Sequence, residues 1–252
     1  MKAIICGANG AMGKLILARL SQEVTGLVSL DGENGVCKTF TDLGIVEADV
    51  IIDFSHHSAI ADVLAYGQKI GAAVVIGATG HTEEEMAALK RLSEEVAVFH
   101  SGNMSVGINL LISLCKTVSA SMGDKADIEI IEKHHNQKLD APSGTALMIA
   151  NAIREAHPCE TEIVYDRTAR RSTRPKTEIG ISAIRGGNIV GEHEVMFCMG
   201  NEIVTIKHSA IGRALFAEGA LRAAEFMKGK TSGFYSMEDL LKKAVSKSAV
   251  EV

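Results

Sequence analysis

The chain has 252 residues, 46% of them hydrophobic and 23% charged, which indicates a folded globular protein of one large domain or two modest ones. The net charge of -5, the aromatic content of 4% and the absence of Trp argue against a nucleic-acid-binding surface. No apolar run approaches the ~20 residues of a membrane span, and the N-terminus has no signal-peptide pattern. The five cysteines are odd in number and form no Cys-x-x-Cys pair. We therefore expect a cytoplasmic protein with reduced thiols and no bound metal.

The first part of the chain alternates between two hydrophobic patterns. Apolar strands are expected at 2–6, 26–30, 46–54, 72–76 and 96–100, and helices at 13–21, 59–70 and 82–95. Continuous apolar strands separated by helices are typical of a parallel sheet that is covered on both faces. The sequence therefore predicts a Rossmann-type α/β domain.

The pattern changes after residue 105. Helices are expected at 106–121, 145–156, 214–227 and 236–244, and strands at 126–133, 162–166, 177–185, 189–198 and 202–209. Strand pieces joined by glycine-containing turns, such as Gly186-Gly187, without intervening helices indicate an open mixed or largely antiparallel sheet. We expect an α+β domain at 105–212, with residues 1–104 and 213–252 forming the α/β domain.

A glycine-rich loop follows the first expected strand and opens the first expected helix. Its glycines lie three residues apart, which permits a tight turn and lets backbone N–H groups approach a pyrophosphate at the positive end of a helix. The alternative is a turn whose glycines serve backbone conformation only. The position at the head of a strand–helix series favours a dinucleotide site. The candidate residues are Gly7, Ala8, Asn9, Gly10, Ala11, Met12 and Gly13.

Other cofactor candidates follow later strands of the same domain, at ends where open α/β sheets bind ligands. Asp31 lies about 20 residues beyond the glycines, where an acidic residue holds the adenosine ribose and favours NADH over NADPH. Lys38 is the nearby cation that would oppose this preference, and an ordinary turn is the alternative for Asp31. For the nicotinamide and its ribose the candidates are Gly77, Ala78, Thr79, Ser101, Gly102, Asn103 and Met104.

The stretch 132–145, Glu-Lys-His-His-Asn-Gln-Lys-Leu-Asp-Ala-Pro-Ser-Gly-Thr, combines proton donors, a cation and an expected helix start. Histidine transfers protons near neutral pH, which makes His134 and His135 candidates for acid–base chemistry. Lys138 supplies a compact cation for a carboxylate or a proton. Adjacent histidines without acidic or cysteine partners make a poor metal site.

The same stretch ends in a turn that leads into the expected helix at 145–156. Free N–H groups at a helix start bind anions, and Gly144 permits close approach. Ser143 or Thr145 is the expected cap of the helix. We expect Ser143, Gly144 and Thr145 to bind a substrate carboxylate; the alternative is a capped helix with solvated charges.

The pattern Glu-x-His-His-x-x-Lys-x-Asp-Ala-Pro-Ser-Gly-Thr-Ala at 132–146 resembles the signature of the dihydrodipicolinate reductase family of bacterial lysine and diaminopimelate biosynthesis. The resemblance covers essentially the whole chain, with further segments at 7–13, 53–55, 77–80, 102–109, 185–193 and 213–220. It implies NADH- or NADPH-dependent reduction of a cyclic imine dicarboxylate, 4-hydroxy-tetrahydrodipicolinate, to tetrahydrodipicolinate. It also implies a homotetramer assembled through the sheet of the middle domain.

The resemblance implies roles for individual residues as well. His134 would donate or accept the proton that the ring needs after hydride addition, and Lys138 would act as a second proton donor. His135, Gly144 and Thr145 would bind substrate carboxylate, and Arg213 would contact the cofactor near the domain junction.

Two rival interpretations remain open from the residues alone. Another two-domain dehydrogenase, acting on an amino acid or imine, would share the glycine-rich loop but has no reason to carry the histidine pair with the lysine and the Ser-Gly-Thr turn. A non-catalytic dinucleotide sensor would need the glycines but no proton donor.

Overall fold

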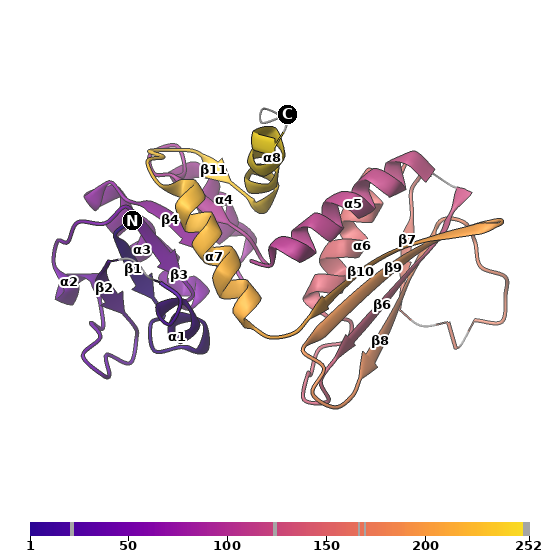
Figure 1. The fold of residues 1–252 in the computed structure, drawn as a ribbon, viewed down its shortest axis with the longest axis horizontal. Coiled ribbons are helices and arrows are strands. Elements are labelled where there is room, and N and C mark those ends of the chain that lie inside the picture. Colours follow the sequence, from indigo (N-terminus) through magenta and orange to yellow (C-terminus); the bar gives the residue numbers. More distant parts are fainter. Residues whose placement is uncertain (21–22, 123–124, 166, 169, 249–252) are drawn as a thin grey trace. The chain divides into compact units, whose positions relative to one another are not determined.

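The computed structural model describes residues 1–20, 23–122, 125–165, 167–168 and 170–248, and it divides into two compact units (Figure 1). The first unit comprises Met1–Val106 and Ala214–Val252, and the second comprises Gly107–Arg213. Ser21 and Asp166, at the ends of an expected helix and an expected strand, lie outside the described residues. None of the helices in the described ranges is long and apolar enough to span a bilayer.

The first unit contains a six-stranded sheet in which every pairing is parallel. The strand order is β11-β5-β4-β3-β1-β2. The strands are β1 (Ala3–Cys6), β2 (Val24–Val28), β3 (Val50–Asp53), β4 (Ala73–Ile76), β5 (Val98–His100) and β11 (Phe234–Tyr235). Because β1 lies between β2 and β3, the strand order reverses beside β1, which is where open sheets of this kind bind ligands.

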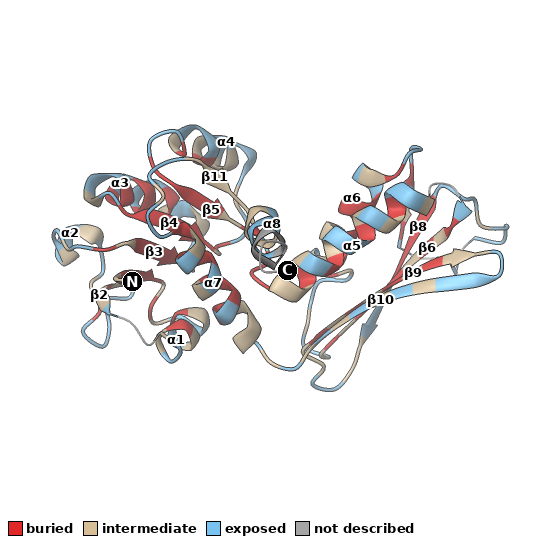
Figure 2. Cartoon of the chain, turned by 45° about the horizontal axis from the view of Figure 1, so that its top comes forward, coloured by how far each residue is buried: buried red, intermediate tan, exposed pale blue. Residues whose placement is uncertain are grey.

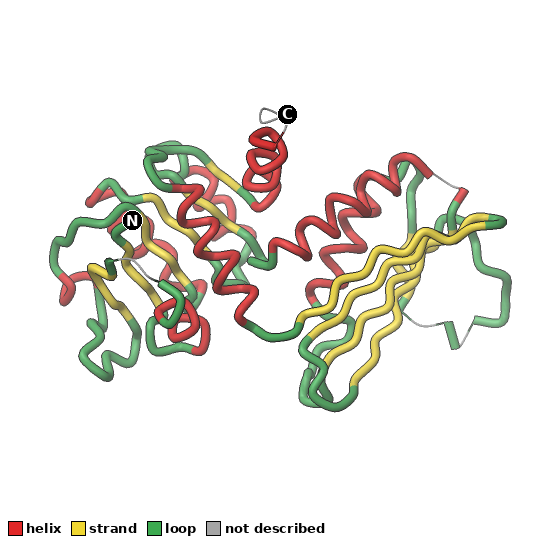
Figure 3. The backbone as a smooth tube through the Cα atoms, viewed as in Figure 1, coloured by secondary structure: helices red, strands yellow, loops and turns green. Residues whose placement is uncertain are grey.

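Helices cover both faces of this sheet, as the tube in Figure 3 shows. The helices are α1 (Ala11–Leu17), α2 (Phe40–Leu43), α3 (Ile60–Ile70), α4 (Glu83–Leu92), α7 (Ala214–Met227) and α8 (Met237–Ser248), with a short 3₁₀ turn at His57–Ala59. Alternate strand residues enter two separate cores. Ile5 and Ile52 pack with α1 and α7, whereas Ile4 and Ile51 pack with α3 and α4. Burial on both faces explains why these strands are continuously apolar.

The second unit contains a five-stranded mixed sheet in the order β10-β9-β6-β8-β7. The strands are β6 (Asp127–His134), β7 (Glu162–Val164), β8 (Glu178–Arg185), β9 (Gly191–Met199) and β10 (Glu202–Ala210). β6 pairs parallel with β8 and antiparallel with β9, so it separates two strands that follow each other in the chain. The turn through Gly186 and Gly187 is therefore no hairpin turn. It crosses the end of β6, where the Gly186 N–H donates to the His134 carbonyl at 2.9 Å.

Helices α5 (Val106–Met122) and α6 (Gly144–Ala156) cover one face of this sheet, and the buried residues of Figure 2 lie between them and the strands. Along β6 every second residue is buried, beginning with Ile128 and Ile130. The same alternation continues to Glu132 and His134, so two polar side chains occupy the helix-covered face at the end of the strand.

The observed architecture confirms the predicted fold class, a Rossmann-type parallel sheet together with an α+β part that has an open mixed sheet. Element ends differ from the prediction where local chemistry decides them. α1 begins at Ala11 rather than residue 13, because Gly10 has extended backbone angles and acts as its N-cap. The third strand is restricted to Val50–Asp53. The sequence did not reveal α2 or the two-residue strand β11, which adds an edge to the first sheet from the far end of the chain.

Candidate active site

The glycine-rich loop connects β1 to α1 in the first unit. Gly7 has a φ of +75°, and a Cβ there would lie 2.6 Å from the Phe54 carbonyl oxygen. A Cβ on Gly13 would lie 2.3 Å from the Gly7 oxygen, so the turn and the helix start pack backbone against backbone. Ala8 is buried, whereas Gly10 and Ala11 are exposed and Met12 is half-buried. Residues with side chains would not fit at either glycine.

The loop contacts the segment that follows β2. The Asn9 side-chain amide donates to Asp31 Oδ1 at 2.6 Å and to the Glu33 carbonyl at 3.2 Å. The hydrogen bond from Asn9 lowers the pKa of Asp31 below its ordinary value. The structure thus brings together the expected phosphate loop and the expected ribose residue, 22 positions apart in the chain.

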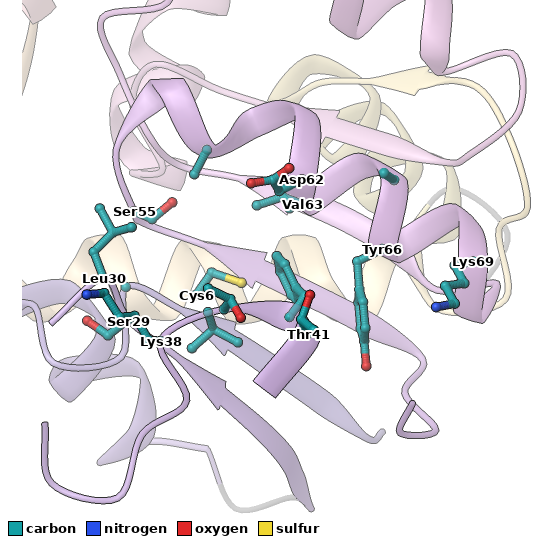
Figure 4. Close-up of a pocket in the computed structure, with 16 residues that line it drawn as sticks. Cys6, Ser29, Leu30, Lys38, Thr41, Ser55, Asp62, Val63, Tyr66 and Lys69 are labelled. Carbon is teal, nitrogen blue, oxygen red and sulfur yellow. The ribbon is translucent and has the colours of Figure 1, made fainter. Parts of the chain in front are cut away.

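A cavity of about 400 Å³ opens beside this loop, at the carboxyl ends of β1, β2 and β3. Figure 4 shows α3 on one side of it and Ser29, Leu30 and Lys38 on the other. Its lining is mainly apolar, with Lys38 among its few charged members. The cavity lies where the strand order reverses, the expected place for a nucleotide in an open parallel sheet.

The other cofactor candidates of the first unit follow β4 and β5. Gly77 donates its N–H to the Asp53 carbonyl at 2.8 Å; Ala78 is buried and Thr79 is exposed. The Ser101 hydroxyl donates to the Asn103 carbonyl at 2.7 Å, which fixes a tight turn. Ser101, Asn103 and Met104 are buried, and Gly102 is exposed. Both segments stand at the carboxyl edge of the sheet, as expected for parallel strands.

In the second unit, His134 belongs to a buried hydrogen-bonded group at the end of β6. Its Nδ1 atom lies 2.6 Å from Glu132 Oε2. Arg185, opposite His134 in the β6–β8 register, donates to both Glu132 oxygens at 2.8 and 2.7 Å. The Glu132 carboxyl group is fully buried and His134 is 9% exposed. A bidentate arginine is the usual way in which a buried carboxylate remains charged.

The start of α6 is attached to the same group. Ser143 is the N-cap of the helix, and its hydroxyl accepts from the Ala146 N–H at 3.2 Å. The Ser143 N–H donates to Glu132 Oε1 at 3.0 Å. The Ser143 hydroxyl also lies 3.2 Å from Nε2 of His193, a buried residue of β9 whose ring centroid is 5.3 Å from that of His134. Of the two caps that the sequence allowed, the structure selects Ser143.

The remaining site candidates of this unit lie nearer the surface. His135 is half-buried directly after the strand, and its carbonyl accepts from the Lys138 N–H at 3.2 Å. The Lys138 ammonium group forms an ion pair with Asp140 at 2.8 Å. Gly144 is exposed at the first position of α6, with Thr145 half-buried beside it. Arg213 is exposed and is the last residue of the second unit.

Burial and pairing set the charges of this group. Burial raises the pKa of Glu132, but hydrogen bonds from Arg185, His134 and the Ser143 N–H offset it, so that this pKa lies below its ordinary value. Burial, with a smaller contribution from His134, lowers the pKa of His193 to about 4. An ionised carboxylate therefore lies behind His134, with a neutral imidazole beside it.

The sequence pattern points to His134 and Lys138 but indicates no role for Glu132, Arg185 or His193. The alternation in β6 contained a signal for Glu132, because it places that residue on the same face as His134. The other two come from β8 and β9, and only the register of these strands brings them to the end of β6.

Comparison with known proteins identifies the family. Residues 1–104 match the family model described as dihydrodipicolinate reductase, N-terminus, and residues 107–241 match the model described as dihydrodipicolinate reductase, C-terminus. The chain belongs to the dihydrodipicolinate reductase family. The predicted family and enzyme class, an NAD(P)H-dependent oxidoreductase, are thereby confirmed.

Curated relatives in this family carry the name 4-hydroxy-tetrahydrodipicolinate reductase. One from Caldanaerobacter subterraneus subsp. tengcongensis is 48% identical over 249 residues, which cover 96% of this chain and 99% of the relative. One from Clostridium novyi is 44% identical over 253 residues, covering 96% and 98%. These coverages mean that the similarity extends through both units.

A solved structure shares the fold. The dipicolinate-bound dihydrodipicolinate reductase from Paenisporosarcina sp. TG-14 superposes with a TM-score of 0.76 at 23% identity, covering 94% of this chain and 97% of that one. An amine dehydrogenase from Mycobacterium smegmatis has a TM-score of 0.60 at 10% identity, with 95% of each chain covered. The fold therefore extends to dehydrogenases with little sequence similarity.

Proposed function

We propose that this chain reduces 4-hydroxy-tetrahydrodipicolinate to tetrahydrodipicolinate with NADH or NADPH, the first unit binding the cofactor and the second the substrate. Family membership supports the reaction. The observation that carries the residue assignment is the buried group at the end of β6. A histidine backed by an ionised carboxylate lies next to the N-terminus of a 13-residue helix, which suits a substrate that is anionic and needs a proton.

In this proposal His134 exchanges the proton with the substrate ring through Nε2, because Nδ1 is engaged by Glu132. Lys138 neutralises a substrate carboxylate and serves as a second proton donor; its present partner is the exposed Asp140. Gly144 and Thr145, at the open start of α6, hold a carboxylate through backbone N–H groups and the Thr145 side chain, with His135 completing the site. Ser143 supports this turn through its N–H and its capping hydroxyl.

The residues of the first unit fit a pyridine dinucleotide. Gly7 and Gly13 let the loop and the start of α1 pack backbone against backbone, and the cavity beside the loop opens at the reversal of strand order. The loop 7–13 would hold the pyrophosphate, Asp31 the ribose, and the segments 77–79 and 101–104 the nicotinamide half. Arg213 would add a contact. The nicotinamide supplies the hydride when it is bound.

Lys38 bears on the choice between the two cofactors. It lines the cavity, whereas Asp31 is held by Asn9. A cation at this place offsets the repulsion between Asp31 and a 2′-phosphate. We therefore propose that the protein accepts both cofactors. The cytoplasmic location and the homotetramer remain parts of the proposal that rest on the sequence and on the family resemblance; sedimentation of the purified protein tests the tetramer.

One assay separates the proposal from its rivals. Purified protein is mixed with NADH or NADPH and with substrate generated enzymatically, and the absorbance of the reduced nicotinamide is followed. We expect oxidation that depends on the substrate. Oxidation with an amino acid or a simple imine in its place would favour the other dehydrogenase, and binding of NADH without oxidation would favour a sensor.

A further inference from the structure

Glu132 joins three segments of the second unit at the site described above. Its Oε2 atom faces His134 Nδ1 and one Arg185 Nη, and its Oε1 atom faces the other Arg185 Nη and the Ser143 N–H. These donors come from the end of β6, from β8 and from the start of α6. The carboxyl group is completely buried. A buried carboxylate with four donor contacts has no freedom to move, so it fixes what it contacts.

We propose that Glu132 is the positioning residue of the reaction. It sets the tautomer of His134, and it holds His134 at a fixed position relative to the carboxylate-binding turn at 143–145. This inference rests on the proposed function, in which His134 exchanges the proton. The carboxyl group of Glu132 is completely buried, so in this proposal it acts through His134.

The direction of the hydrogen bond follows from charge. An ionised carboxylate only accepts, so the proton of the neutral His134 ring resides on Nδ1 and Nε2 is the atom that takes up and releases a proton. The opposite edge of the ring borders Gly191, where a Cβ would lie 3.1 Å from Nε2. Because residue 191 is glycine, it places no side chain against this edge of the ring.

Arg185 stabilises the ionised Glu132 carboxylate, because a buried carboxylate without a paired cation is strongly unfavourable. The same guanidinium group also donates to the Asp140 carbonyl, within the loop that carries Lys138. The Glu132–Arg185 pair thus attaches the strand end, the loop and the helix start to one another. These are the three segments from which the candidate substrate residues come.

The substitution Glu132→Gln tests the proposal. The Oε1 site faces two N–H groups that can only donate, whereas the Oε2 site faces one Arg185 N–H and His134 Nδ1, which can accept once its proton moves. The glutamine amide nitrogen will therefore occupy the Oε2 site and donate to Nδ1. The His134 proton then moves to Nε2, which can no longer accept one from the medium. We expect kcat to fall by about 100-fold or more, by analogy with removal of the carboxylate behind a catalytic histidine. The dissociation constant for NADH should stay within about twofold of wild type.

Glu129→Gln is the matched control. Glu129 lies on the same strand and also pairs with an arginine, since Arg174 Nε donates to its Oε1 at 2.9 Å, but it touches neither histidine. We expect its kcat to remain within about twofold of wild type. Equal losses of kcat in the two variants, or a loss confined to the KM for substrate, would mean that Glu132 is only a structural ion pair.

A spectroscopic measurement keeps the test independent of activity. In wild-type protein with ¹⁵N-labelled histidine, the resonance that disappears in His134→Gln should report a protonated Nδ1 and an unprotonated Nε2 in the neutral ring. The opposite tautomer would overturn the inference, even if Glu132→Gln does not fold. A wild-type protein that shows the expected tautomer but oxidises no NAD(P)H would contradict the proposed function, whereas the assignment of the His134 tautomer to Glu132 would stand.

Discussion

Replacing His193 tests how burial controls protonation beside the site. In the folded protein its pKa is lowered from 6.5 to about 4, chiefly by burial. The unfolded chain therefore binds a proton at His193 more readily than the folded chain does. The contribution of the neutral His193 side chain to the free energy of unfolding is fully present above pH 6.5 and is lost as the pH falls towards 4.

The magnitude follows from the two pKa values. At about 1.4 kcal/mol per pH unit, the interval from 6.5 to about 4 corresponds to about 3 kcal/mol of unfolding free energy, of which about 2 kcal/mol is lost by about pH 5. Glutamine at this position carries no charge at either pH and retains an N–H that reaches Ser143. In His193→Gln the loss of stability between about pH 7 and pH 5 should therefore be about 2 kcal/mol smaller than in wild type.

Urea unfolding at the two pH values, followed by circular dichroism, measures the difference. His56→Gln is the matched control, because His56 is exposed and belongs to the first unit; it should keep the wild-type pH dependence. The reasoning is refuted if His193→Gln and wild type lose the same free energy between the two pH values, since burial would then not govern the protonation of His193.

Four further substitutions test the site assignments. His134→Gln should lower kcat by about 100-fold or more while the NADH dissociation constant, measured by fluorescence, stays unchanged; undiminished turnover would remove His134 as the acid. Lys138→Ala should reduce kcat/KM for the substrate by about 10-fold or more, and an effect on NADH binding instead would contradict its place in the second unit. Asp31→Ala should weaken NADH more than NADPH in steady-state assays, and equal effects would exclude its ribose role. Lys38→Ala should weaken NADPH more than NADH; the reverse would contradict the proposed acceptance of both cofactors.

Local patterns were sufficient for much of the fold. The apolar strands of the first unit are recognisable because both of their faces are buried, as Ile4 and Ile5 show. Helix starts were predictable where a capping residue stands in the sequence, as with Ser143, one of the two expected caps of α6. The strand pairing of the second unit was not predictable in this way, since nothing local to Gly186 indicates that the chain crosses the end of β6.

The sequence by itself determined the family, the two kinds of sheet, and the candidate proton donors and cation at 134–138, because these depend on residue types at fixed short spacings. Only the tertiary structure decided what lies behind His134. Arg185 and His193 are 51 and 59 residues further along the chain, and they reach Glu132 and His134 because β8 and β9 flank β6 on opposite sides. The order and register of these strands join segments that are far apart in the chain, and the burial of one face of the sheet specifies them. The spacing of residue types along the sequence does not indicate which strands pair with β6 or in which register.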